Sequence, residues 1–325
     1  MIAVVFMIMI ISGALFLPAI NSISGRISKT DRVNANVLVV EGWLLPYAIE
    51  MAKNEFKNNS YDHLITTGIR ISDYFQVSMN GYLIFYTHSR IKETDVSENH
   101  TISIDAYSEM EDEDCAHFNV FVNDSLVADF FADKKRRRYE ISWEGRLSEI
   151  DSVLVQFDND RFDEFGDRNL YVKEIILDRR INFHYQYNSE YDVGELDGQR
   201  RVNNNFSSHA ELARNSLLAL GIDSSRIIAV TGRKVRINRT LSSAVAFSEW
   251  LKTSGIEVKG INIITRGTHA RRTRMTYNKI LNANYEIGII SLPDYKENAS
   301  RKYKVMKTIR EIFSLAYYWI LLIPY

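Results

Sequence analysis

The sequence has few cysteines, few prolines and almost no net charge, and each shortage excludes a class of protein. Its 325 residues include one cysteine, Cys115, which excludes an internal disulfide framework and a zinc site built on several cysteines. Four prolines and the lack of a Gly/Ser-rich tract leave no obvious flexible linker. The net charge of -1 gives no reason to expect a nucleic-acid partner.

What is present is the composition of a folded globular protein. Apolar residues make up 46% of the chain and charged residues 25%. A chain of this length predicts roughly two domains.

The N-terminus carries a long uncharged run. Ile2 to Ile20 contains no charged residue, and about 20 apolar residues span the hydrocarbon core of a membrane. A cleaved signal peptide is the alternative, but no clear small-x-small cleavage site precedes Arg26. We therefore expect a transmembrane anchor at residues 1–24, and a single-pass membrane protein whose globular part lies outside the cytoplasm. The orientation stays open, because the basic residues after the run favour the cytoplasmic side.

Short β-branched runs alternate with helical patterns in two separate parts of the chain. The runs are residues 36–41, 63–67, 226–230, 261–265 and 286–291. Their shortness and their valine and isoleucine content favour buried strands. Strands that alternate with helices predict the α/β class, with a Rossmann-like, doubly wound parallel sheet.

The pattern between these two parts is different. From about Val77 to Arg180 there is no convincing long helix, and short alternating runs are separated by polar turns such as Asn123-Asp124. This spacing is typical of an all-β sandwich. We therefore expect a sandwich at 77–180, inserted into a Rossmann-like domain formed by 33–76 and 181–325.

The stretch Ile261 to Arg274 is the strongest candidate for a binding site in the α/β part. It predicts a buried strand, a loop at Gly267 and a basic helix that begins near His269. Ligands lie outside the carboxyl ends of strands in such sheets, and a helix N-terminus there favours an anion. Arg272 could bind phosphate, and His269 could act as a general acid–base catalyst. The alternative is a helix whose polar face happens to be basic.

A second candidate lies within the expected sandwich, in the segment VQFDNDRFDEFGDRNLYVKEI from Val155 to Ile175. Carboxylates and amides are clustered there on one loop, and such hard oxygen ligands suit calcium. Their spacing does not fit an EF-hand. An acidic turn that binds nothing is the alternative.

The strings FDND and DRNLYV resemble the signature of calcium-dependent, xylan-binding carbohydrate-binding modules, over about residues 99–180. The resemblance implies a small β-sandwich in which bound calcium contacts sugar hydroxyls. It implies calcium as a cofactor, a polysaccharide or glycan as a partner, and oxygen ligands among Asp160, Asp163, Asp167 and Asn169.

The α/β part resembles the YdcF-like (SanA/ElyC-related) bacterial family. The resemblance rests on VLVVEGW, ITTGI, the segment 239–244 and the T-x-x-x-H-A-x-R pattern of 265–272. It implies a Rossmann-like fold, a link to envelope biogenesis and a small anionic or nucleotide-like ligand. The residues it places in the site are Gly42, Gly68, Thr240, Thr265, His269 and Arg272, with His269 as the candidate catalytic residue. Trp43 and Arg239, which lie within the same segments, are two further candidate ligand-binding residues.

Two hypotheses for the function follow. The first is a membrane-anchored envelope protein whose α/β domain binds a small anionic or nucleotide-like ligand in polysaccharide biogenesis, while the sandwich holds glycan. The second is a non-catalytic glycan-binding or scaffolding protein with a degenerate α/β pocket. No nucleophile–base–acid set is visible in the sequence, so catalysis stays open.

Overall fold

The structure, a computed structural model, describes residues 22–71, 73–88, 91, 99–110, 115–163, 166–196, 198, 201–203, 206–282, 284–294 and 301–325. The chain divides into two compact units. One comprises Met1–Arg70 and His209–Tyr325 and is called the α/β unit below. The other, Ile71–Ser208, is called the β unit.

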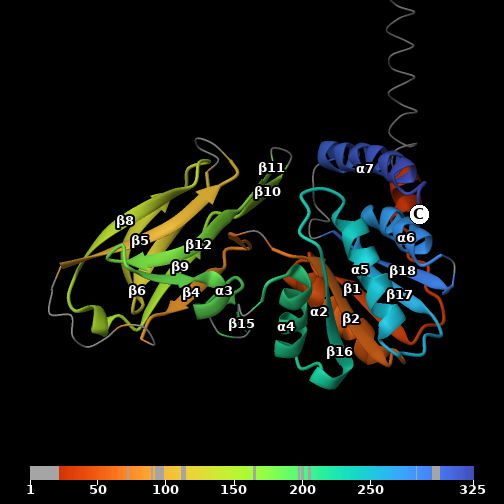
Figure 1. Cartoon of the computed structure of the whole chain (residues 1–325). Helices are drawn as coiled ribbons and strands as arrows, with labels where there is room; N and C mark the ends of the chain where they lie inside the picture. The colour runs from red at the N-terminus through yellow and green to blue at the C-terminus, as the bar shows by residue number, and fades with distance from the viewer. Residues whose placement is uncertain are drawn as a thin grey trace, which may run out of the picture. The chain divides into compact units, whose positions relative to one another are not determined.

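The α/β unit is built on a five-stranded parallel sheet with the order β16-β2-β1-β17-β18 (Figure 1). Its strands are β1 (Val37–Glu41), β2 (His63–Ile69), β16 (Ile227–Gly232), β17 (Ile261–Arg266) and β18 (Ile287–Leu292). Each of the five short apolar runs that the sequence marks as a strand overlaps one of them. Buried side chains point to both faces of β1, whose residues are all buried, which explains why that run is apolar without alternation.

Helices cover both faces of this sheet. They are α2 (Pro46–Asn58), α4 (His209–Ala219), α5 (Arg239–Thr253), α6 (His269–Ile280) and α7 (Arg301–Leu321), with a short 3-10 turn, η3, at Ser224–Arg226. On one face, Val37 and Val39 pack with residues of α5, α6 and the end of α7. On the other, Leu38 and Val40 pack with α2 and α4. The alternating side chains of β1 therefore contribute to two separate cores.

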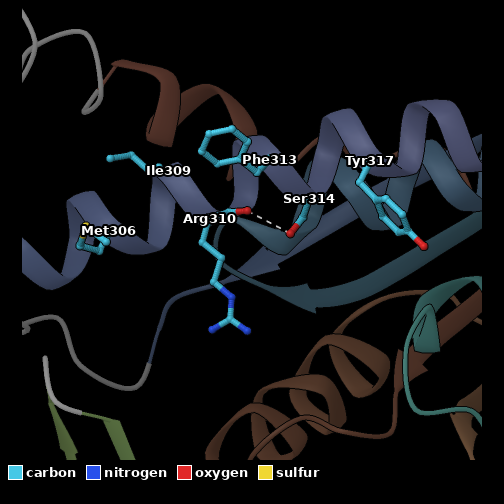
Figure 2. A pocket seen from close by; sticks show the side chains of 6 residues that line it. All are labelled: Met306, Ile309, Arg310, Phe313, Ser314 and Tyr317. Carbon is cyan, nitrogen blue, oxygen red and sulfur yellow. Dashed lines mark hydrogen bonds between the residues drawn. The ribbon is translucent and has the colours of Figure 1, made fainter.

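Helix α7 carries apolar side chains both on the face that packs on the α/β unit and on its exposed face. Figure 2 shows Met306, Phe313 and Tyr317 along this helix, and all three are exposed. Tyr318 and Leu322 are buried in the core of the α/β unit. The C-terminal segment therefore packs on the α/β unit through these two residues, while Trp319, Ile320 and Ile323 are exposed.

The β unit consists of antiparallel sheets. One contains β13-β12-β5-β8 with β3 paired to β12, another has the order β15-β14-β4-β9-β6-β7, and β10 and β11 form a hairpin. Its elements are β3 (Phe75–Val77), β4 (Tyr82–Tyr86), β5 (Asn99–Ser108), β6 (His117–Val122), β7 (Ser125–Phe131), β8 (Arg137–Glu144), η2 (Leu147–Glu149), β9 (Ser152–Phe157), β10 (Arg161–Asp163), β11 (Gly166–Arg168), β12 (Leu170–Leu177), β13 (Ile181–His184), α3 (Tyr185–Asn188), β14 (Ser189–Asp192) and β15 (Arg201–Asn203). Buried and partly exposed residues alternate along β6, as the period of a half-buried strand requires.

The expected fold class is wrong for the chain as a whole. Among the strands that the structure describes, only the five of the α/β unit form a parallel sheet, and the more numerous others belong to antiparallel sheets. The chain is therefore mostly antiparallel β rather than a Rossmann-like α/β protein with an insert. The physical reason is the length of the connections between strands. Antiparallel strands can be joined by short turns, so the β unit fits many strands, whereas each parallel strand needs a crossover of a dozen or more residues.

The expected transmembrane helix and single-pass membrane localisation are corrected as well. Among the described helices, none combines the length and the apolar character that crossing a membrane demands. The longest, α7, carries several charged residues in its first half. The run from Ile2 to Ile20, which prompted the expectation, lies outside the described residues.

Candidate functional site

Two neighbouring parallel strands bring the candidate site together at one edge of the α/β sheet. Strand β1 ends at Glu41 and β17 at Arg266. They pair directly with each other, at the point where the order of strands along the sheet changes direction. Ligands of open α/β sheets bind outside the carboxyl ends of strands at such a point. The loop after β17 leads into α6, which begins at His269.

Glu41 lies at the centre of this edge and is 2% exposed. Thr265 Oγ1 donates a hydrogen bond to Glu41 Oε2 at 2.5 Å, and Thr273 Oγ1 lies 3.4 Å from each carboxylate oxygen. Burial raises the pKa of Glu41, and the hydrogen bond from Thr265 and the charges of His269 and Arg272 offset only part of this rise. Burial thus favours the protonated form of Glu41.

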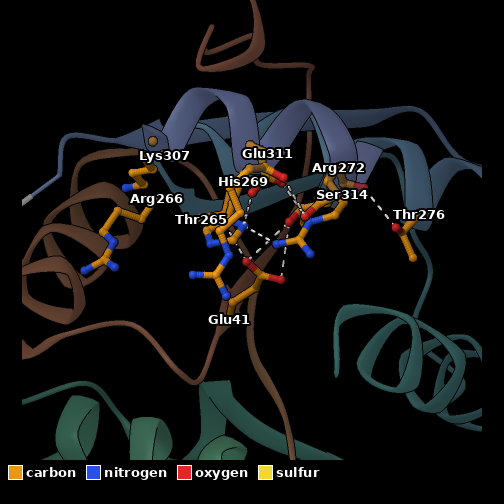
Figure 3. A network of polar contacts seen from close by, with 12 residues as sticks. Glu41, Thr265, Arg266, His269, Arg272, Thr276, Lys307, Glu311 and Ser314 are labelled. Atoms are coloured by element: carbon orange, nitrogen blue, oxygen red, sulfur yellow. Dashed lines mark hydrogen bonds and ion pairs between the residues drawn. The ribbon is translucent and has the colours of Figure 1, made fainter. Parts of the chain in front are cut away.

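His269 and Arg272 lie one turn apart on α6 and contact the same carboxylate, that of Glu311 on α7 (Figure 3). Arg272 Nε is 2.9 Å from Glu311 Oε1, and His269 Nδ1 is 3.3 Å from Glu311 Oε2. Burial would raise the pKa of Glu311, but the hydrogen bond with His269 and the charges of His269, Arg272 and Lys307 outweigh it and lower the pKa. Glu311 is therefore an ionised partner, in contrast to Glu41.

A second charged cluster lies beside the first. Asp294 Oδ1 is 3.3 Å from Arg266 Nε, and Asp294 Oδ2 accepts a hydrogen bond from Lys307 Nζ at 2.6 Å. The Arg266 guanidinium lies over the ring of Trp43, 5.4 Å from its centroid. Trp43 also makes an edge-on contact with His269, and the two ring centroids are 5.0 Å apart. Trp43 therefore joins the two clusters.

Close packing against the start of α4 explains why glycines stand at the ends of β1 and β2. A Cβ on Gly42 would lie 2.3 Å from the carbonyl oxygen of His209, and one on Gly68 would lie 2.7 Å from the backbone nitrogen of Ala210. Only glycine lets the start of α4 approach these strand ends so closely. Gly267 adopts φ +52°, and a Cβ there would meet the Asp294 carboxylate. In this structure the space above these glycines is filled by the chain itself.

The two remaining sequence-predicted residues of the α/β site, Arg239 and Thr240, lie at the start of α5. Arg239 is exposed. Thr240 hydrogen-bonds Tyr318, whose ring lies 5.1 Å from the Arg272 guanidinium carbon. Thr240 thus reaches the site through Tyr318, whereas Thr265, His269, Arg272 and Trp43 form its centre.

Sequence reasoning missed two acidic residues of the site, Glu41 and Glu311. Glu41 had a visible sign, because it is a charged residue that ends an otherwise apolar buried run, VLVVE. Glu311 had none, since its helix could have packed anywhere on the unit. His209 lies nearby at the start of α4, where burial lowers its pKa to about 4 and the charge of Arg239 adds to the effect. It is a neutral histidine at the start of α4.

The expected calcium ligands lie around the β10–β11 hairpin of the β unit. Asp160 precedes β10 and is partly exposed, Asp167 is exposed, and Asn169 is 2% exposed. The side chain of Asp163 lies outside the described part of the chain. Where side chains are described, His, Cys, Asp and Glu form no group of three that could hold a metal. The Oδ1 atom of Asn169 is buried and has no hydrogen-bond partner among the described residues.

Comparisons with known proteins give weak structural neighbours only. No protein-family model matches the chain, and no curated protein matches it significantly, so the resemblance to the YdcF-like family gains no support. One structural neighbour is a carbohydrate-binding module of the CBM36 type in complex with calcium and xylotriose, with 17% identity, 33% of this chain and 85% of that chain covered, and a TM-score of 0.23.

Two further neighbours are carbohydrate esterases of family two. The one from Cellvibrio japonicus has 9% identity, with 78% of this chain and 95% of that chain covered, and a TM-score of 0.22. The one from Clostridium thermocellum, in complex with cellohexaose, has 9% identity, coverages of 76% and 82%, and a TM-score of 0.22. The neighbours are thus carbohydrate-binding and carbohydrate-esterase proteins, but none of these scores is high enough to assign a family or a function to the chain.

Proposed function

We propose that this chain binds glycan through its β unit with the help of calcium, and that its α/β unit binds a small anionic ligand. In this proposal the segment 77–180 is the carbohydrate-binding-like module. The proposal retains the ligand types that the sequence predicts and leaves the reaction, if there is one, open.

The buried amide oxygen of Asn169 carries the first half of the proposal. A buried acceptor without a partner costs about 1–3 kcal/mol, so a native protein needs a reason to keep one. Arg168 Nη1 donates to the Asn159 carbonyl oxygen at 3.0 Å, and Asn80 Oδ1 accepts from the Asp160 backbone N–H at 2.7 Å, so both ends of the loop are held in place. Calcium prefers the carboxylate and amide oxygens that Asp160, Asp163, Asp167 and Asn169 offer.

Calcium and glycan binding can be tested on the full chain. We expect calcium to raise the melting temperature, because a ligand that binds only the native state stabilises it by about 2.7 kcal/mol at one hundred times its dissociation constant. Xylotriose, the sugar bound in the neighbour named above, should then bind with calcium and not with a chelator. The double substitution Asp160→Ala with Asp167→Ala should abolish both effects.

The matched control is Asp151→Ala, which removes an exposed carboxylate of the same unit. It should respond to calcium as the wild type does. A calcium shift of the same size in the double variant, or xylotriose binding that ignores the chelator, would overturn this half of the proposal.

The carboxylate of Glu311 carries the second half, because Arg272 and His269 already bind an anion in the structure. A guanidinium matches carboxylate and phosphate geometry. We propose Thr265, Arg272 and Trp43 as the central ligand-binding residues, His269 as the acid–base residue of any reaction, and Gly42, Gly68, Arg239 and Thr240 at the margin. Calorimetry with phosphate and glucuronate tests the site. Equal binding by the wild type and Arg272→Ala would exclude it.

A further inference from the structure

Glu311 occupies the position that an anionic ligand of this site would take. The residue is 5% exposed, and its carboxylate uses one oxygen toward Arg272 and the other toward His269. The burial of this carboxylate and its lowered pKa mean that the site holds a full negative charge. The contact comes from α7, which follows the last strand of the sheet and is not part of α6 or the strand edge.

The fit of Glu311 to Arg272 is incomplete. The two atoms that form the ion pair are 2.9 Å apart, yet within the described part of the chain neither Arg272 Nε nor Glu311 Oε1 has a hydrogen-bond partner. The N–H of Arg272 is therefore close to the oxygen without pointing at it. A carboxylate that is free to orient can face the guanidinium with both oxygens, and this bidentate arrangement is the stronger one.

A third unpaired group lies at the start of the same helix, α6. Thr268 directly precedes α6 and is 5% exposed, and its Oγ1 atom has no hydrogen-bond partner among the residues described. It makes no cap hydrogen bond to its own helix. A buried hydroxyl without a partner costs free energy that a ligand oxygen would recover.

Charged side chains of the first half of α7 reach the site, while Val305, Ile309 and Ile312 of the same half are partly buried. Lys307 lies one turn before Glu311 and donates to Asp294 at 2.6 Å, while Met306 and Phe313 are 58% and 72% exposed. The buried apolar residues of the C-terminal segment, Tyr318 and Leu322, lie further along. Since a buried ion pair contributes little net free energy once its desolvation is included, the contact of Glu311 with Arg272 is the one at which a second anion can compete.

We propose that the anion site of the α/β unit takes a ligand with a carboxylate group, and that Glu311 occupies the ligand's place until the ligand displaces it. This inference rests on the proposed anion site. A carboxylate is the ligand group expected there, because the group that contacts Arg272 and His269 in the structure is a carboxylate.

The experiment is calorimetric titration of the full chain with glucuronate, with glucose as the neutral control and phosphate as the competing anion, at constant ionic strength. The wild type is compared with Glu311→Gln and Arg272→Ala. If Glu311 leaves the site in about one wild-type molecule in ten, the apparent affinity of the wild type is about tenfold below that of the unoccupied site. Glu311→Gln should then bind glucuronate about tenfold more tightly than the wild type. Arg272→Ala should lose binding, and glucose should not bind to any variant.

Two further variants guard against misfolding and surface effects. Lys307→Met loosens α7 and leaves Arg272, His269 and Glu311 intact, so it should also raise the affinity for glucuronate. Glu249→Gln removes an exposed carboxylate from α5 and should bind as the wild type does. Together these variants separate opening of the site from a general change of charge.

The outcomes are distinguishable. If Glu311→Gln and Lys307→Met bind glucuronate no more tightly than the wild type, while Arg272→Ala loses binding, occupancy by Glu311 is wrong and the anion site stands. If phosphate binds and glucuronate does not, the carboxylate class is wrong. If neither anion binds to any variant, the proposed anion site itself fails.

Discussion

Thr265 and Glu41 lie on adjacent parallel strands and are joined by a hydrogen bond of 2.5 Å from the threonine hydroxyl to the carboxylate. Both residues are buried, Thr265 completely. The bond ties the ends of β1 and β17 together under the site. It also decides how Glu41 responds to substitution and to pH, because it is the largest effect that opposes the burial of this carboxylate.

Thr265→Val removes this donor and keeps the branched shape of the side chain. We expect the free energy of unfolding at pH 7 to fall by about 1–3 kcal/mol, since a buried carboxylate loses its closest donor. Urea unfolding measures the change. Thr253→Val is the control, because its hydroxyl bonds a carbonyl oxygen at an exposed helix end, and it should change stability by less than about 0.5 kcal/mol. Equal losses in both variants would contradict the role given to Thr265.

Glu41→Gln tests the raised pKa of Glu41. A group with a raised folded-state pKa contributes stability that is present below the unfolded pKa of about 4.3 and is lost as pH rises through the folded value. The wild type should therefore lose stability relative to Glu41→Gln between pH 4 and pH 8. Chemical denaturation at a series of pH values measures this difference. A difference that stays constant across the range would show that Glu41 titrates normally.

Glu311→Gln should show the opposite dependence on pH. The pKa of Glu311 is lowered in the folded state, so its contribution is present above about pH 4.3 and is lost as pH falls through the folded value. The advantage of the wild type over Glu311→Gln should thus be largest near neutral pH and shrink in acid. The same denaturation series measures it. An advantage that grows in acid would mean that the cations beside Glu311 do not hold its charge.

Gly42→Ala tests the packing of α4 against β1. The added Cβ would lie 2.3 Å from the carbonyl oxygen of His209, and the backbone would have to move. Overpacking of this kind costs about 1–3 kcal/mol. Gly25→Ala is the matched control, because nothing lies within 4 Å of its Cβ position and Gly25 is helical. It should be neutral or stabilising by up to about 1 kcal/mol in thermal unfolding. A neutral Gly42→Ala would refute the close approach of α4.

The sequence by itself determined the elements and those site residues that are close to one another along the chain. The apolar runs predicted the strands β1, β2, β16, β17 and β18, because burial on both faces leaves a local sign in the composition. It also predicted His269 and Arg272 as neighbours, since residues three apart on a helix share a face. The overall fold class was wrong, because local patterns do not weigh one part of a chain against another. The membrane localisation was corrected because no described helix has the length and apolar character to cross a membrane.

Only the tertiary structure decided what surrounds these residues. The strand order placed Glu41 beside Thr265, although 224 residues separate them in the sequence. The packing of α7 brought Glu311 to Arg272 and His269, and no periodicity in α7 states which neighbour its polar face will meet. Local patterns report whether a side chain is buried. Which charge it meets there depends on long-range packing, because electrostatic partners are set by distance in space.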